Sequence, residues 1–162
     1  MNLVSHSTGS YIHSDDPGEP TTGKPRLSIT DHEAEILAAL VHGLVVVEFG
    51  TGLGVSTRAL ASTARLVVTA DIDEWVQQTI WPTLPKNVTT CYDRDSLTQR
   101  VDAVFIDGDH TEEGTARDVE HAMRIASRLI VMHDTFAPTV RAACDDEWLF
   151  IGTTHGLGVR YL

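Results

Sequence analysis

The sequence has little positive charge and no long apolar run. Its 162 residues include 12 Lys and Arg against 23 Asp and Glu, which gives a formal net charge of −11. This excess of acid argues against a nucleic-acid partner, because such binding depends on basic side chains that neutralise phosphates. No apolar run is long enough to span a bilayer, and the N-terminus lacks the basic start and apolar centre of a signal peptide. We therefore expect neither a nucleic-acid nor a membrane partner.

Cysteine is also scarce. The two cysteines, Cys91 and Cys144, lie far apart and without the spacing of a metal site. A disulfide framework is not expected, and a reduced, cytoplasmic setting fits the composition better. The length is that of one domain.

The chain divides into two parts by composition. Residues 1–27 are rich in Ser, Thr, Gly and Pro and show little periodicity, which predicts a flexible arm. Residues 28–162 are predicted to form the folded domain. Little sequence is inserted between its expected elements, so a lid over a ligand could come only from the arm or from a second copy in a homo-oligomer.

Apolar strands and amphipathic helices are predicted to alternate through the domain. Strands are expected at 44–49, 66–70, 87–92, 101–106 and 129–132, with a closing hairpin at 148–153 and 158–162. Helices are expected from Thr30, where Glu33 completes a capping box, to Gly43, and at 55–64, 74–81, 111–128 and 139–147. Strands that are apolar on both faces and alternate with helices indicate an α/β fold with a mostly parallel sheet.

A glycine loop follows the first strand of this pattern. The segment EFGTGLGVST places Glu48 before glycines at 50, 52 and 54. The dinucleotide fingerprint has glycines in the order G-x-G-x-x-G, and here Val55 stands where its third glycine would be. Glu48 would repel a pyrophosphate and suits the ammonium group of a methionine moiety. These departures favour a nucleoside-bearing methyl donor over a nicotinamide dinucleotide.

A carboxylate follows the second strand as well. In TADIDEW, Asp71 is the first acid after the apolar run, where an acid can accept hydrogen bonds from both ribose hydroxyls. Asp73 is the second choice, and either acid could instead cap the next helix.

These motifs carry a resemblance to a known family. The series EFGTGLG, TADID, DRDS, FIDGDH and MHDTF resembles the class I S-adenosylmethionine-dependent methyltransferases over residues 30–162. It is most similar to the small-molecule O-methyltransferases of the macrocin and cephalosporin-biosynthesis type. The resemblance implies a Rossmann-like, doubly wound sheet of seven strands with helices on both faces and the last strand antiparallel.

The resemblance also implies roles for residues near the cofactor. S-adenosylmethionine would have its methionine part enclosed by the loop, its ribose at Asp71 and its adenine beside Asp95 and Ser96. Asp107 is expected at the cofactor too. The loop positions expected to bind are Glu48, Gly50, Thr51, Gly52 and Gly54.

Acids and histidines end the fourth and fifth strands and are candidates for chemistry. In the resembling family the metal ligands map onto Asp107, His133 and Asp134, which suggests Mg²⁺ or another divalent metal. Relatives often have a carboxylate or amide where this chain has His133, and imidazole suits other metals better than Mg²⁺. Three explanations stay open: a different metal, a role for His133 as a base or supporting residue, or no metal, with the two acids only capping helices.

For the general base, Asp109 and His110 are the candidates, and His155 is a weaker one. The expected activity is O-methylation of a small-molecule acceptor. Two alternatives stay open, a non-catalytic S-adenosylmethionine-binding module and, less favoured, an NAD-dependent oxidoreductase.

Overall fold

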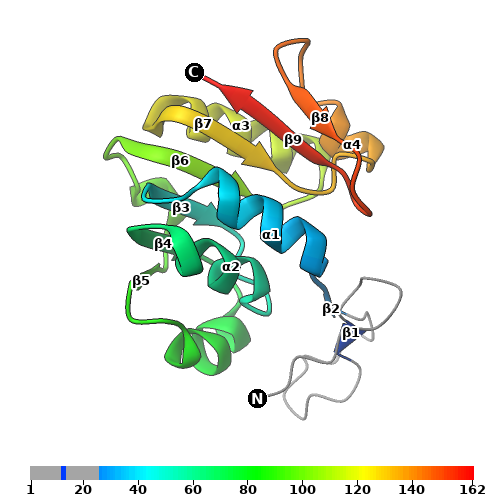
Figure 1. Cartoon of the computed structure of the whole chain (residues 1–162). Helices are drawn as coiled ribbons and strands as arrows, with labels where there is room; N and C mark the ends of the chain where they lie inside the picture. The colour runs from blue at the N-terminus through cyan, green and yellow to red at the C-terminus, as the bar shows by residue number, and fades with distance from the viewer. Residues whose placement is uncertain (1–11, 14–25) are drawn as a thin grey trace.

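The computed structural model describes residues 12–13 and 26–162, and its centre is a seven-stranded sheet (Figure 1). The strand order is β5-β4-β3-β6-β7-β9-β8, and only β9 runs antiparallel to its neighbours. The strands are β3 (Val45–Phe49), β4 (Leu66–Ala70), β5 (Val88–Cys91), β6 (Val101–Ile106), β7 (Ala126–Met132), β8 (Leu149–Ile151) and β9 (Leu157–Tyr161). The predicted fold class is confirmed, including the antiparallel last strand.

Helices cover both faces of the sheet (Figure 1). On one face α1 (Asp31–Leu40) and α2 (Val55–Thr63) enclose a core that includes Val46, Phe105 and Val159. On the other, α3 (Glu112–Ile125) and α4 (Pro138–Arg141) enclose Val47, Phe49 and Ile130. Successive residues of a strand point to opposite faces, so each apolar run supplies both cores.

The N-terminal segment is described only in part. A two-stranded pair joins β1 (Ile12–His13) to β2 (Arg26–Leu27), and β2 leads into α1. Most of the predicted arm, residues 1–11 and 14–25, lies outside the described residues.

Three predicted helices have different bounds. The helix expected at 74–81 becomes a π-helical turn η1 (Val76–Ile80) followed by a 3-10 turn η2 (Trp81–Thr83), where Pro82 cannot continue a helix because it lacks an N–H. The helix expected at 111–128 ends at Ile125, because Ala126 already pairs with Val101 of β6.

The helix expected at 139–147 is also shorter, since α4 ends at Arg141. The acids that would have formed its last turn are used elsewhere. Asp145 and Glu147 form ion pairs with Arg160 of β9.

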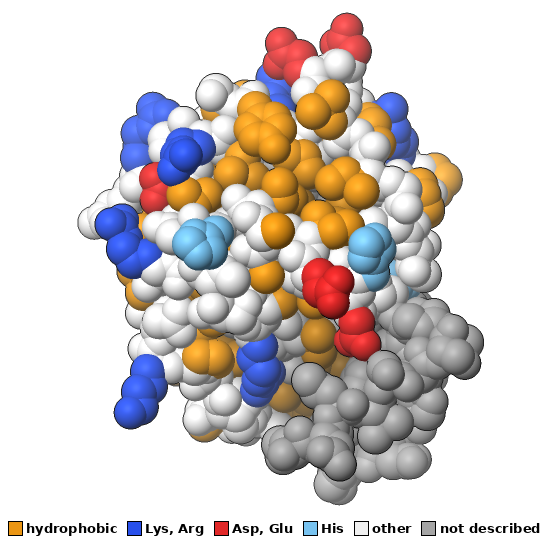
Figure 2. All heavy atoms as spheres, viewed as in Figure 1, with side chains coloured by type: hydrophobic (Ala, Val, Ile, Leu, Met, Phe, Trp, Pro, Cys, Tyr) orange, Lys and Arg blue, Asp and Glu red, His pale blue; other side chains and the backbone are white. Residues whose placement is uncertain are grey.

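On the α1 side of the sheet, part of the surface of β8 and β9 is not covered by a helix. Figure 2 shows hydrophobic side chains gathered over β9 and β8, beyond the end of α1. Leu149 and Tyr161 are 61% and 62% exposed, and the strand register places both on the same face as Val159, towards the α1 side. Within the described residues no helix is long and apolar enough to cross a membrane.

Candidate functional site

The carboxyl ends of β3, β4, β6 and β7 meet at one edge of the sheet. The chain order reverses between β3 and β6, which are neighbours in space but not in sequence. Ligands of open α/β sheets bind beyond the strand ends at such a switch point. The loops that follow these four strands therefore build the candidate site.

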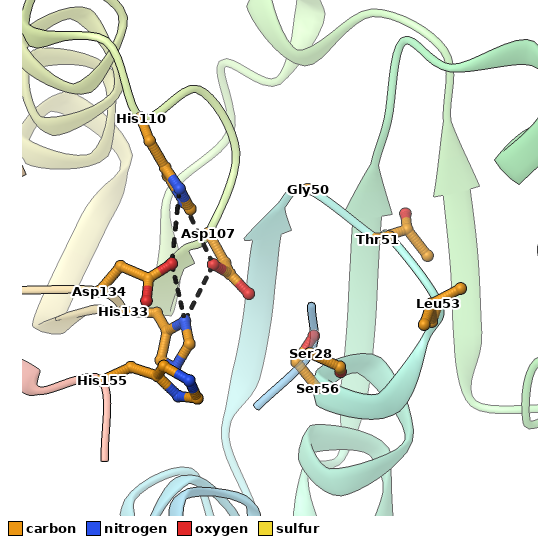
Figure 3. A pocket seen from close by; sticks show the side chains of 11 residues that line it. Ser28, Gly50, Thr51, Leu53, Ser56, Asp107, His110, His133, Asp134 and His155 are labelled. Atoms are coloured by element: carbon orange, nitrogen blue, oxygen red, sulfur yellow. Dashed lines mark hydrogen bonds and ion pairs between the residues drawn. The ribbon is translucent and has the colours of Figure 1, made fainter. Parts of the chain in front are cut away.

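The glycine loop after β3 is held tightly against the end of β6. Gly50, Gly52 and Gly54 all have positive φ. A Cβ at Gly50 would lie 2.2 Å from the carbonyl oxygen of Asp107, so only glycine allows this approach. The loop forms one wall of a cavity of about 280 Å³ (Figure 3).

Asp71 at the end of β4 fixes the same loop. Its Oδ2 accepts hydrogen bonds from the backbone N–H groups of Thr51 at 2.9 Å and Gly52 at 3.0 Å. Its Oδ1 accepts from the N–H of Asp73. The carboxylate predicted to hold a ribose thus also holds the loop that would surround the rest of the cofactor.

Glu48 lies beneath the loop and is completely buried. Its Oε2 accepts hydrogen bonds from the hydroxyls of Thr57 on α2 at 2.6 Å and Thr69 on β4 at 2.7 Å, whereas Oε1 has no hydrogen-bond partner among the described residues. Burial raises the pKa of Glu48 to about 7, although the hydroxyl contacts act in the opposite direction. Glu48 does not line the cavity.

The opposite wall of the cavity carries acids and imidazoles (Figure 3). Asp107 follows β6, and Asp134 lies two residues beyond the end of β7. Asp134 is the only non-glycine residue with positive φ in the described chain. His110 bridges them, with Nε2 3.4 Å from Asp107 Oδ1 and Nδ1 3.4 Å from Asp134 Oδ2. Burial alone would raise the pKa of Asp107, but hydrogen bonds from His110 and His133 lower it. The hydrogen bond to Asp107 in turn raises the pKa of His110.

His133 lies behind these acids and is 4% exposed. Its Nδ1 is 3.1 Å from Asp107 Oδ1 and 3.5 Å from Asp134 Oδ2, and its Nε2 is 3.3 Å from Glu33 Oε2. Burial alone would lower the pKa of His133, but hydrogen bonds to Asp107, Asp134 and Glu33 raise it to about 12. The structure therefore brings together the three residues expected to bind a metal.

Glu33 is the site residue that sequence reasoning missed. The predicted capping box with Thr30 is confirmed, but the same carboxylate also contacts His133 and His155. Burial alone would raise the pKa of Glu33, yet the hydrogen bonds from His133, Thr30 and His155 lower it far below its usual range. The capping-box pattern explained Glu33 completely, so no signal in the sequence pointed to its second set of contacts.

Other predicted residues lie outside the cavity. Asp109 accepts a hydrogen bond from the N–H of Thr111 at the start of α3 and does not line the cavity. Asp95 pairs with Arg94 at the surface, and Ser96 bonds back to Asp93. The lining residues are Ser28, Gly50, Thr51, Gly52, Leu53, Ser56, Asp107, His110, His133, Asp134 and His155.

The donor set of this wall fits a divalent cation. Single ligand atoms of Asp107, His110 and Asp134 lie within 4.8 Å of one another, and Nδ1 of His133 faces both carboxylates. Carboxylate oxygens suit Mg²⁺, Ca²⁺ and Mn²⁺, while imidazole nitrogens shift the preference towards Zn, Fe and Ni. A mixed set of this kind fits a transition metal better than Mg²⁺.

The part of the chain that holds the glycine loop and the strand-end acids matches a known protein family. A protein family described as a methyltransferase domain matches residues 47–135, which is more than half of the chain and includes the glycine loop, Asp71, Asp107 and Asp134. No curated protein matches the chain.

Solved structures share the fold at low identity. A Klebsiella pneumoniae protein provisionally assigned as an O-methyltransferase is 18% identical, with a TM-score of 0.71 over 90% of this chain and 84% of that one. An O-methyltransferase from Bacillus cereus in complex with SAH is 18% identical, with a TM-score of 0.65 over 83% and 82%. A tRNA (m1A58) methyltransferase from Aquifex aeolicus is 17% identical, with a TM-score of 0.67 over 83% and 70%. At these identities the likeness shows the fold alone, and the acceptors of these proteins differ.

Proposed function

The chain belongs to the methyltransferase-domain family, and from that premise we propose that it transfers the methyl group of S-adenosylmethionine to a hydroxyl of a small molecule, with help from a divalent metal. The chain is a methyltransferase, which decides against the NAD-dependent oxidoreductase and the non-catalytic binding module that the sequence left open.

One observation carries the proposal for the acceptor. The cavity has the glycine loop on one wall and Asp107, His110, His133 and Asp134 on the other (Figure 3). A donor beside the loop would direct its sulfonium methyl at the acidic wall. A hydroxyl bound at that wall would be in line to attack the methyl carbon, and such alignment supplies a large part of the rate of a displacement.

The acidic wall can also prepare the hydroxyl. As the new O–CH₃ bond forms, the S–CH₃ bond breaks, S-adenosylhomocysteine leaves and the hydroxyl proton must go to a base. His110 lines the cavity with a half-exposed side chain, whereas Asp109 is turned to the start of α3. Of the two predicted bases, the geometry therefore favours His110.

A bound divalent cation would supply charge stabilisation for the oxyanion as the proton leaves. Asp107, Asp134 and His133 are the residues that would hold it. The acid-rich cavity also suits the cationic donor, since the sulfonium and the ammonium of S-adenosylmethionine are both positive. The assignment of the cofactor's ribose to Asp71 and of its adenine to Asp95 and Ser96 belongs to the same proposal.

The test is an assay with methyl-labelled S-adenosylmethionine and a panel of phenols, catechols and sugars, with and without EDTA. We expect labelled ether product that is lost with EDTA and restored by added metal. His110→Gln should reduce kcat roughly 100-fold or more while cofactor affinity stays at the wild-type level. Asp109→Asn is the matched control and should remain active. Equal activity of wild type and His110→Gln would contradict the assignment of the base, and a product labelled on nitrogen or carbon would contradict the acceptor class.

A further inference from the structure

Glu33 is a buried carboxylate whose contacts exceed what a helix cap needs. Its Oε2 accepts hydrogen bonds from the N–H of Thr30 at 2.8 Å and from the Thr30 hydroxyl at 3.0 Å. Its Oε1 accepts from the hydroxyl of Thr153 at 2.7 Å and from the N–H of His155 at 2.9 Å. Two imidazoles also reach Oε2, through His155 Nδ1 at 3.1 Å and His133 Nε2 at 3.3 Å. The carboxylate thus joins the start of α1, the end of β7 and the turn between β8 and β9.

The His133 ring stands between this carboxylate and the cavity wall. Its Nε2 lies 3.3 Å from Glu33 Oε2. Its Nδ1 faces Asp107 and Asp134 (Figure 3). A neutral imidazole has one N–H and one lone pair, and the partner of the N–H decides which nitrogen is left to bind a metal.

We propose that Glu33 is a positioning residue that completes a carboxylate–histidine–metal triad. His133 Nε2 lies 3.3 Å from Glu33 Oε2 and makes no aligned hydrogen bond among the described residues. When a cation binds, Glu33 accepts the Nε2–H and so directs the lone pair of Nδ1 towards the cation position beside Asp107 and Asp134. This inference rests on the metal-assisted form of the proposed function. A cation at Nδ1 takes the place of a proton there, because histidine must be deprotonated to ligate.

The triad also accounts for a histidine at this position. A carboxylate ligand needs no tautomer to be selected, whereas an imidazole ligand does. His133 therefore requires an acceptor on its far side, and α1 supplies that acceptor from a residue that is completely buried. With a nitrogen ligand in place, the site should prefer Mn²⁺, Co²⁺ or Zn²⁺ to Mg²⁺.

A cation among Glu33, His133 and His155 is the competing arrangement, since their ligand atoms also lie within 4.8 Å of one another. The contacts of Glu33 argue against it. Both oxygens already accept hydrogen bonds from backbone N–H groups and hydroxyls. A cation there would displace the donors of Thr30 and Thr153, and those of Thr30, which is buried, would be left without a partner, which is costly.

The test is titration of the full chain with Co²⁺, followed by calorimetry and by the visible absorption bands of the bound ion. Glu33→Gln keeps the side-chain volume and removes the charge, and we expect its Co²⁺ affinity to fall by about 10- to 100-fold with a changed spectrum. Thr153→Val is the matched control, because it removes a hydrogen bond to the other oxygen of Glu33 and should keep the wild-type affinity and spectrum. Equal effects of the two substitutions would overturn the proposal, as would loss of Co²⁺ binding in His155→Phe to the same extent as in His133→Ala.

A measurement on the wild-type chain covers the case in which Glu33→Gln does not fold. In protein with ¹⁵N-labelled histidine and bound Zn²⁺, the His133 ring should be protonated at Nε2 and ligated at Nδ1. The opposite assignment, or no metal binding at all, would overturn the inference, and the labelled-donor assay would still decide methyl transfer separately. Conversely, if this chain has a Glu33-dependent metal site but methylates no hydroxyl, the triad is supported and the proposed acceptor class is contradicted.

Discussion

Two glutamates of the described residues, Glu33 behind His133 and Glu48 beneath the glycine loop, are completely buried, and they are held in opposite ways. Glu33 accepts hydrogen bonds from backbone N–H groups and hydroxyls and faces two imidazoles, so its pKa is lowered far below the usual range despite burial. Glu48 accepts hydrogen bonds only from hydroxyl groups, and its Oε1 has no hydrogen-bond partner among the described residues. Burial raises its pKa to about 7.

The difference shows that burial by itself does not decide the charge of a carboxyl group. The donors do, because each hydrogen bond or positive group that favours the ionised form offsets part of the lost hydration. The histidine side of the cavity therefore holds a fixed ionised carboxylate. The glycine-loop side holds a carboxyl group that can gain or lose its proton near neutral pH.

The largest effect on stability is expected from the removal of Glu33. Glu33→Ala would leave the buried imidazole of His133 and the partly buried N–H of His155 without this acceptor, and we expect the free energy of unfolding to fall by about 3–5 kcal/mol. Urea unfolding followed by circular dichroism measures the loss. Glu35→Ala, at an exposed position of the same helix, is the control, and a loss no larger than in that variant would contradict the account of Glu33.

The second test uses pH on Glu48. Below about pH 4.5 the carboxyl is protonated in both the folded and unfolded states, and above pH 7 it is ionised in both. Between these values only the unfolded state releases the proton, so the free energy of unfolding of the wild type should fall with rising pH relative to Glu48→Gln, by roughly 3 kcal/mol in total. Unfolding curves of both proteins from pH 5 to 8 give this difference. Curves that stay parallel would show that Glu48 is ionised throughout, like Glu33.

The smallest expected effect concerns Asp71, a partly exposed carboxylate that holds the glycine loop through two backbone N–H groups. Asp71→Ala should lower the free energy of unfolding by about 1–2 kcal/mol and weaken S-adenosylmethionine binding roughly tenfold or more, because the loop loses charge-assisted hydrogen bonds. Calorimetry with the cofactor measures the affinity, and Glu74→Ala, exposed nearby, is the control. Unchanged affinity would show that neither the loop contacts nor a ribose contact of Asp71 matters for binding.

The sequence by itself determined the order of strands and helices, the glycine loop and the acids at the strand ends. These features are local, because each depends on an apolar run and on the residues that directly follow it. Parallel strands then bring their carboxyl ends to one edge of the sheet. The resemblance that rested on these motifs implied the seven-stranded, doubly wound sheet and its antiparallel last strand, and the structure supplied the order of the strands.

Only the tertiary structure decided which side chains turn into the cavity. Asp109 and His110 are neighbours in sequence, yet the first turns to the start of α3 and the second to Asp107 and Asp134. From the sequence, Glu33 is predicted only to form a helix capping box. Its contacts with Thr153 and His155 span 120 and 122 residues of sequence. Such contacts depend on how α1 packs beside the turn between β8 and β9, and a carboxylate takes its charge from every donor around it, so no local pattern could have revealed the role of Glu33.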